Sequence, residues 1–519
     1  MKKAIYLIIA LIGLSAPSCS DSMLDFSPTD SGSGKELLKS ASTAITSVNG
    51  VYRSMWTAGW STTANTHQCF GIAAYNLALD CMADDLIMQS QGNGWFWGDH
   101  CYNVKSNYTS SAFRSYDVWY ANYKWIANVN YIIDAEPEMA GTEADVAYVA
   151  GQAYAIRALC YLNLATWFSR APYNSLTGAS RWNEPCVPVY TTGTSIDTGG
   201  QPRESLRTVY GRIDQDIDRA IELLEKARET TLAENNKSHI NLYVALGIKS
   251  RACLAEGDWD GAFKAAKRVI DEGGYAVGTK SDLTGGMNSL DKQNVMWGAG
   301  IQVADQAGGY AGFFTHMDNK EGAYAKSAPK LISKQLYNRI SATDIRRDWW
   351  DPSDKESPYV SKKFSFANVA SFLGDYIYMR VEEMYFTAAE AGLRLDDLKS
   401  ARELMNTVMA ERDPGYSANN RSGTLLGATT TTWTGSFLEN ILTHRRIELW
   451  GEYGRLFDVR RLGQGIDRRT DDGFSEECIS MMNRRNVNIT KADTYDWVLT
   501  IPKAELDANP NINEEDQNP

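Results

Sequence analysis

The fold is decided by the stretch NLYVALGIKSRACLAEGDWDGAFKAAKRVIDEGG, which runs from Asn241 to Gly274. Apolar and small residues recur every three or four positions on both sides of Gly257-Asp258-Trp259, and this spacing places them along one side of a helix. The second half carries Ala262, Phe263, Ala266, Val269 and Ile270. The stretch therefore predicts two short helices joined by a tight turn.

A second stretch, near residues 378–411, repeats this design around a turn at Asp396-Asp397. Its apolar positions are Val381, Met384, Tyr385, Ala388 and Ala391 before the turn, and Leu398, Ala401, Met405 and Val408 after it. Helix pairs of this length with small residues at their contacts are typical of tetratricopeptide repeats. Because one hairpin cannot bury its apolar face alone, we expect the two to stack with other helices into a superhelix.

The remaining chain combines helical and irregular segments. Apolar stripes predict helices over residues 149–168 and 209–224, whereas residues 275–374 and 415–436 are loop-rich insertions of the kind that often carries binding function. We predict one mostly α domain over residues 35–519, with a tetratricopeptide-like superhelix and an irregular second subdomain packed against it. The alternative is an ordinary bundle of unrelated helices.

The N-terminus predicts export. Lys2 and Lys3 precede an apolar run from Ala4 to Leu14, which is too short to span a bilayer and is followed by Cys19. We predict a cleaved lipoprotein signal peptide over residues 1–18, a lipid on Cys19, and a flexible tether over residues 19–34. Plain secretion with an unmodified Cys19 is the alternative.

Composition restricts the partners. The formal net charge of −12 argues against nucleic acid and acidic polymers, and favours neutral ligands. The chain has 5 His against 15 Trp and 27 Tyr, so we predict neither a metal site nor a cofactor. Its 8 cysteines include no C-x-x-C pair, and buried free thiols are the default interpretation. One disulfide among Cys69, Cys81 and Cys101 stays open.

Motifs of catalysis are absent from the sequence. There is no H-E-x-x-H or G-x-S-x-G, and Gly32-Ser33-Gly34-Lys35 lacks the other residues of a phosphate loop. The charged segment from His444 to Arg461 alternates Arg and Glu among apolar residues, which indicates an architectural role. A glycosidase stays open because its two acids need not be adjacent, and Asp84-Asp85 alone is weak evidence for one.

An aromatic loop is the best candidate binding site. Glycines at positions 92, 94 and 98 surround Trp95 and Trp97, whose indole faces suit the C–H faces of a sugar ring. The predicted ligand-binding residues of this loop are Asn93, Trp95, Trp97, Asp99, His100 and Tyr102. Alternatively, these rings fix the loop to the body of the protein. A second candidate loop holds Tyr310, Phe313 and His316, whereas the rings at 116, 119 and 123 keep helical spacing and are predicted to be mostly core.

These segments together resemble the SusD/RagB family of Bacteroidetes outer-membrane nutrient-binding lipoproteins. The resemblance rests on the lipoprotein start and on segments spread over most of the chain: DFSP at 25–28, GQAYAIRA at 151–158, VIDEGGY at 269–275, MRVEEMY at 379–385, HRRIELW at 444–450, RLFDVRRLG at 455–463 and IPKAELDANP at 501–510. It implies a helical, tetratricopeptide-like fold and a lid role over a TonB-dependent, SusC-like outer-membrane transporter.

We therefore expect a non-enzymatic lipoprotein, anchored in the outer membrane and exposed at the cell surface, that captures oligosaccharides or polysaccharides for this transporter. Three alternatives remain: an oligopeptide-binding protein of the same transporter type, a surface glycosidase, and an adaptor that binds only protein.

Overall fold

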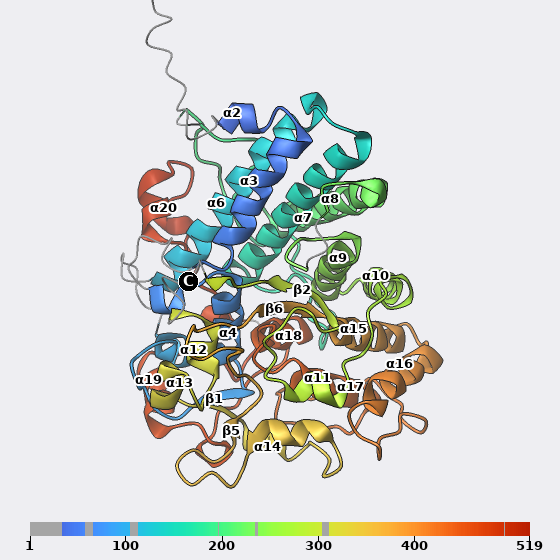
Figure 1. Cartoon of the computed structure of the whole chain (residues 1–519). Helices are drawn as coiled ribbons and strands as arrows, with labels where there is room; N and C mark the ends of the chain where they lie inside the picture. The colour runs from blue at the N-terminus through green and yellow to red at the C-terminus, as the bar shows by residue number, and fades with distance from the viewer. Residues whose placement is uncertain are drawn as a thin grey trace, which may run out of the picture.

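The computed structural model describes residues 34–57, 66–103, 113–195, 197–233, 237–303, 311–492 and 494–519 (Figure 1). Helices dominate these ranges and the strands are short, so the prediction of a mostly α protein is confirmed. The predicted signal peptide, Cys19, the tether up to residue 33 and Tyr310 lie outside the described residues. Among the helices that are described, none is both long enough and apolar enough to cross a bilayer.

The N-terminal half is a layer of long helices. α3 (Ala41–Ser54), α6 (Phe113–Ala135), α7 (Glu143–Phe168) and α8 (Leu206–Lys226) pack against one another, with α7 in the middle (Figure 1). Thr142 and Ser205 cap α7 and α8 by accepting hydrogen bonds from the backbone N–H of Asp145 and Thr208. Gly151 lets the two helices approach closely, because a Cβ there would lie 2.9 Å from Cγ of Leu224.

The two predicted hairpins are present. α9 (Leu242–Glu256) and α10 (Trp259–Glu272) are joined at Gly257, which has a φ of +76°, and Asp258 caps α10. α15 (Val381–Arg394) and α16 (Leu398–Ala410) are joined at Asp396, and Asp397 caps α16. Because α8 packs on α9 and α10 packs on α15, the hairpins continue the helical layer as one superhelix, and the ordinary-bundle alternative is wrong (Figure 1).

The second subdomain holds small antiparallel sheets among short helices. The strands β1 (Leu86–Met88), β3 (Lys330–Ile332), β5 (Val360–Ser361) and β4 (Trp350–Asp351) pair in that order, and β2 (Val295–Ala299) pairs with β6 (Tyr376–Arg380). The short helices of this subdomain are α4 (Ile72–Met82), α5 (Trp97–His100), α11 (Lys280–Thr284), α12 (Phe313–Met317), α13 (Ala323–Ser327) and α14 (Lys334–Tyr337), whereas α2 (Gly34–Leu37) packs on α3. The sequence predicted only loops for residues 275–374. Strands this short are too brief to show the alternation of apolar and polar residues, and the strands with which they pair lie far away in the sequence.

The C-terminal segment is fixed by buried ion pairs. It contains α17 (Phe437–Glu448), α18 (Arg455–Leu462), α19 (Glu476–Arg484) and α20 (Lys503–Ala508). Arg445 pairs with Asp458 at 2.8 Å, and Arg461 reaches Glu390 on α15 at 2.8 Å. The predicted architectural role of the charged segment is confirmed. The seven described cysteines are all buried and unbonded, as the default interpretation expected.

Candidate functional site

The predicted aromatic loop begins with a tight turn against α13. The backbone N–H of Gly94 donates to the carbonyl of Gln91 at 2.8 Å. Gly92 has a φ of +51°, and a Cβ at this position would lie 2.7 Å from the carbonyl oxygen of Ser327. Only glycine fits this left-handed conformation and close approach. The turn therefore positions the next residue, Trp95, beside α13, where it contacts Tyr324.

Trp95 is half-buried and lies in a cluster of three rings. Its indole stacks on the imidazole of His67, with centroids 4.7 Å apart and planes at 17°. Tyr324 of α13 meets Trp95 edge-on at 6.0 Å, and its hydroxyl lies 2.5 Å from Nδ1 of His67. We call His67, Trp95 and Tyr324 the Trp95 cluster. The packing of the rings on one another fixes the orientation of the indole.

The Trp95 cluster is uncharged at neutral pH. Burial lowers the pKa of His67. Behind it, His316 is buried, with Nε2 2.5 Å from the carbonyl oxygen of His67; burial, reinforced by the charge of Lys330, lowers the pKa of His316 well below its usual value. Both imidazoles are therefore neutral at pH 7. A surface of aromatic rings without a formal charge suits a neutral ligand.

Asn93 and Trp95 are the predicted loop residues that remain accessible. Asn93 is exposed at the tip of the turn, and part of the Trp95 side chain reaches the solvent. The site therefore combines an exposed amide at the tip of the turn with a partly exposed indole two residues later. Ligand binding by these two residues stays a prediction.

The other predicted residues of the loop are buried and have packing roles. Asp99 accepts two hydrogen bonds from Arg114, at 2.9 and 3.0 Å. Tyr102 donates to the carbonyl of Met82 at 2.7 Å, and His100 stacks on Phe474. Trp97 is only 3% exposed. For these four residues, the contacts agree with the alternative in which the side chains fix the loop to the body.

The second predicted loop also turns inward. Phe313 lies in α12, where it is buried edge-on against Phe364, and its backbone N–H donates to the hydroxyl of Tyr376. His316 supports the Trp95 cluster from beneath, with its ring 4.9 Å from that of Tyr324. Residues 313 and 316 therefore contribute to the site as a support and not as its exposed surface.

Sequence reasoning missed His67 and Tyr324. His67 lies in a short 3-10 turn, η2 (Thr66–Gln68), and Tyr324 lies far along the chain in α13. No local pattern joins residues so distant in sequence. The signals that the sequence did offer were the scarcity of histidine and the glycines around Trp95.

The acidic pair Asp84-Asp85 is part of the buried ion network. Arg446 contacts Asp84 at 3.0 Å and Asp85 at 2.5 Å, and Arg455 contacts both carboxylates. Burial raises the pKa of the Asp84 carboxyl, but the charges of Arg455 and Arg446 outweigh this effect and the pKa falls to about 2.

Within the described ranges, no group of three or more His, Cys, Asp or Glu side chains could hold a metal ion.

Comparisons with known proteins cover both halves of the chain. The model of the SusD family matches residues 326–519, and that of a family described as starch-binding associating with outer membrane matches residues 43–254. No curated protein matches the sequence.

Several solved structures share the fold over nearly the whole chain. A SusD-like carbohydrate binding protein from Bacteroides vulgatus ATCC 8482 is 25% identical, with a TM-score of 0.72 over 92% of this chain and 98% of that one. A SusD superfamily protein from Bacteroides thetaiotaomicron VPI-5482 is 22% identical, with a TM-score of 0.73 over 92% of this chain and all of that one. Surface glycan-binding protein A from Bacteroides thetaiotaomicron, in complex with laminarihexaose, is 15% identical, with a TM-score of 0.62 over 92% of this chain and 99% of that one. With its superhelix of paired helices and its loop-rich second subdomain, the chain belongs to the SusD family.

Proposed function

We propose that this protein binds neutral oligosaccharides without cleaving them, and that the Trp95 cluster is the surface on which they bind. The observation that carries this proposal is the indole of Trp95, which is half-buried and stacked on the neutral His67, with Asn93 exposed two residues earlier in the chain. An indole held in this way can cover the C–H face of a pyranose, and the Asn93 amide can bond its hydroxyls.

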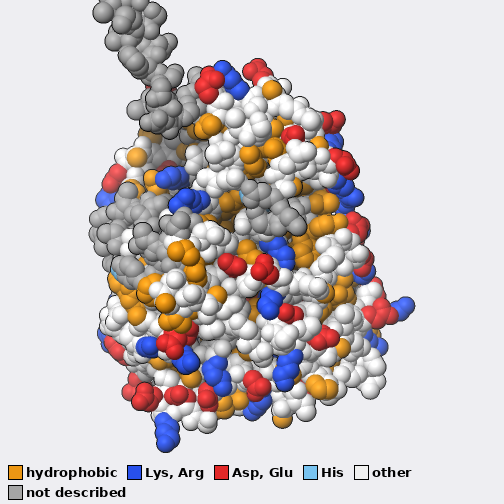
Figure 2. All heavy atoms as spheres, in the orientation of Figure 1, with side chains coloured by type: hydrophobic (Ala, Val, Ile, Leu, Met, Phe, Trp, Pro, Cys, Tyr) orange, Lys and Arg blue, Asp and Glu red, His pale blue; other side chains and the backbone are white. Residues whose placement is uncertain are grey.

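The charge of the molecule supports a neutral ligand. The net charge is −12, and acidic and basic side chains are interspersed over the described part of the face in Figure 2. A polyanion would find no large basic area on that face to bind. A neutral glycan binds instead through ring stacking and hydrogen bonds, neither of which requires a charge on the protein.

The comparisons support a carbohydrate over a peptide. The solved structure titled as a SusD-like carbohydrate binding protein and the complex with laminarihexaose both have this fold. From the family we further propose that Cys19 carries a lipid, that the protein lies at the surface of the outer membrane, and that it delivers its ligand to a TonB-dependent, SusC-like transporter.

A glycan array tests the proposed function on the purified mature protein, with an array of oligopeptides beside it. We expect binding to one or more neutral oligosaccharides and to no peptide. Incubation with the bound glycan at high protein concentration should release no new reducing ends. Binding to peptides alone would contradict the proposal, and so would turnover that disappears when one acidic residue is replaced.

A further inference from the structure

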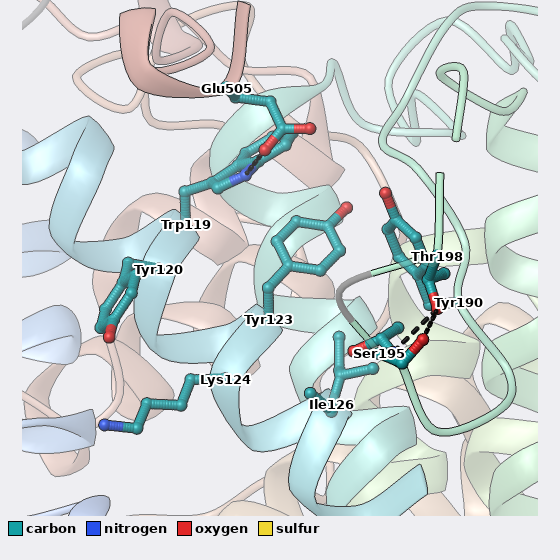
Figure 3. A pocket seen from close by; sticks show the side chains of 11 residues that line it. Trp119, Tyr120, Tyr123, Lys124, Ile126, Tyr190, Ser195, Thr198 and Glu505 are labelled. Atoms are coloured by element: carbon teal, nitrogen blue, oxygen red, sulfur yellow. Dashed lines mark hydrogen bonds between the residues drawn. The ribbon is translucent and has the colours of Figure 1, made fainter. Parts of the chain in front are cut away.

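A pocket of about 460 Å³ lies on the opposite side of the helical layer from α10, between α6, residues 190–195 with Thr198, and α20. Figure 3 shows aromatic rings from α6 on one wall, Tyr190 on the other and Glu505 at one end. We call this space the α6 pocket. It shares no lining residue with the Trp95 cluster. Its volume is within the range of pockets that bind small ligands.

Aromatic rings form the walls of the α6 pocket in fixed orientations. Trp119 and Tyr123 lie 4.9 Å apart at 49°, and Tyr190 meets Tyr123 edge-on at 5.9 Å. Tyr120 is half-buried and stacks on Tyr116 with planes at 9°. Because each ring is oriented by a neighbouring ring, the pocket offers apolar surfaces that do not have to reorganise when a ligand enters.

Glu505 supplies an oriented carboxylate. Its Oε2 accepts a hydrogen bond from the indole N–H of Trp119 at 3.2 Å, and its Oε1 accepts one from the Asn509 amide at 2.8 Å. Each carboxylate oxygen can accept two hydrogen bonds, so both oxygens keep capacity for another donor. Two neighbouring hydroxyl groups of a ligand would match this arrangement.

The wall that carries Tyr190 is bonded to the C-terminal part of α6 and to α7. The buried Asn130 donates to the carbonyls of Tyr190 and Thr192 at 3.2 and 3.0 Å. The hydroxyl of Tyr161 donates to the carbonyl of Tyr190 at 2.8 Å, and the N–H of Gly193 donates to Asp134 at 2.7 Å. Asn130 and Asp134 belong to the C-terminal part of α6 and Tyr161 belongs to α7, so these bonds fix the position of the wall relative to both helices, and the cavity is a built feature of the fold.

We propose that the α6 pocket is a second carbohydrate-binding site, which takes one or two units of a neutral sugar. The rings cover the C–H faces, while Glu505 and the hydroxyls of Ser195 and Thr198 bond the sugar hydroxyls. The carboxylate disfavours both lipid chains and acidic sugars. This inference rests on the proposed function, because it assigns the same class of ligand to a separate surface.

The test is isothermal titration calorimetry of the mature protein with four neutral hexasaccharides: laminarihexaose, maltohexaose, cellohexaose and xylohexaose. We expect one of them to bind at two sites per chain. Trp95→Ala should weaken one site about tenfold and leave the other unchanged. Tyr120→Ala should weaken the remaining site about tenfold, the effect of losing one stacked ring. Glu505→Gln preserves the shape of the side chain and should also weaken that site.

The controls separate this inference from the proposed function. Tyr243, a half-buried tyrosine of α9 paired edge-on with Tyr275, is the matched control, and Tyr243→Ala should change neither site. If Tyr120→Ala and Glu505→Gln keep the melting temperature and leave binding of the sugars unchanged while Trp95→Ala weakens it about tenfold, the second site is refuted and the proposed function stands. If the intact protein binds none of the four sugars and no glycan of the array, both proposals are refuted.

Discussion

Arg412 and Glu448 form a two-point ion pair in the core: Nε of Arg412 lies 2.9 Å from Oε2 of Glu448, and Nη2 lies 2.9 Å from Oε1. Both side chains are fully buried. Arg380 of β6 and Arg346 also contact the carboxylate, each at 3.0 Å. Glu448 therefore connects α17 to the end of the superhelix and to the second subdomain.

Removing Glu448 should destabilise the whole domain. Glu448→Ala leaves three buried guanidinium groups without their shared partner, and a loss of this kind costs about 3–5 kcal/mol. Urea unfolding measures the change. The control is Asp260→Ala, which breaks an exposed helical pair with Lys264 and should cost at most about 0.5 kcal/mol. Equal effects of the two substitutions would contradict the role given to Glu448.

Asp80 should make stability depend on pH in the neutral range. Burial raises the pKa of its carboxyl to about 8, and Oδ2 is buried without a hydrogen-bond partner among the described residues. A raised pKa means that the folded protein keeps a proton that the unfolded chain has lost, so this contribution to stability falls as pH rises from about 4 to about 8. Asparagine cannot ionise. Between pH 5 and pH 8, the free energy of unfolding of Asp80→Asn should therefore decrease less than that of the unchanged protein.

To test this prediction, the free energies of unfolding of the unchanged protein and of Asp80→Asn are measured by urea unfolding at each pH, and their difference is compared between pH values. Other titrating groups contribute to both proteins, so they cancel in the difference. A difference that is constant from pH 5 to pH 8 would show that Asp80 titrates at its usual pKa.

The packing of the first hairpin predicts the effect of a larger side chain. Ala266 of α10 is fully buried where the helix faces its neighbours. Ala266→Trp should overpack this contact and destabilise the protein by roughly 1–3 kcal/mol or more. The exposed Lys264, two positions earlier, gives the control Lys264→Trp, whose melting temperature should stay nearly unchanged. Similar melting temperatures of both variants would mean that α10 presents its other face to the core.

The lipid anchor is tested at Cys19, which follows the short apolar run of the N-terminus. Cys19→Ala removes the thiol that would carry the lipid, so the protein should leave the membrane fraction and incorporate no labelled palmitate. Cys69→Ala, which removes a buried thiol, should keep both properties. Membrane association and labelling of the Cys19→Ala variant would contradict the anchor.

The helices were predictable because their signals are local. The stripes that end at Phe168 and Leu224 and the turns at Gly257 and Asp397 are readable within a few residues. The sheets were not predictable, since Leu86 of β1 pairs with Ile332 of β3, and neither strand exceeds three residues. The alternation of apolar and polar side chains that marks a strand cannot be recognised over three residues.

The binding surfaces were predictable only in part, for the same reason. Glycines in the sequence indicated the exposed turn before Trp95, but His67 and Tyr324 meet it only through the fold. On α6, helical spacing correctly indicated that Trp119 is buried. Helical spacing could not indicate that Tyr190 and Glu505, which belong to distant segments of the chain, line a pocket together with Trp119.

The aromatic loop itself offers a matched pair of substitutions. Trp95 is half-buried on the surface, whereas Trp97, two residues later, is almost fully buried. A sugar ring that covers about 60 Å² of the Trp95 indole contributes about 1.5 kcal/mol at roughly 25 cal/mol per Å². Trp95→Ala should therefore weaken binding of the array-selected glycan about tenfold and leave the melting temperature nearly unchanged.

Trp97→Ala should do the reverse. It opens a cavity in the core, and truncation of a buried aromatic ring costs about 3–5 kcal/mol, so the melting temperature should fall by several degrees. The folded fraction should keep its affinity, because the exposed turn at Asn93 and the stacking of Trp95 on His67 do not include Trp97. Calorimetric titration and thermal unfolding of both variants separate the two roles. If Trp97→Ala weakens binding while Trp95→Ala lowers only the melting temperature, the sugar contacts the inner ring, and the loop must open when the ligand binds.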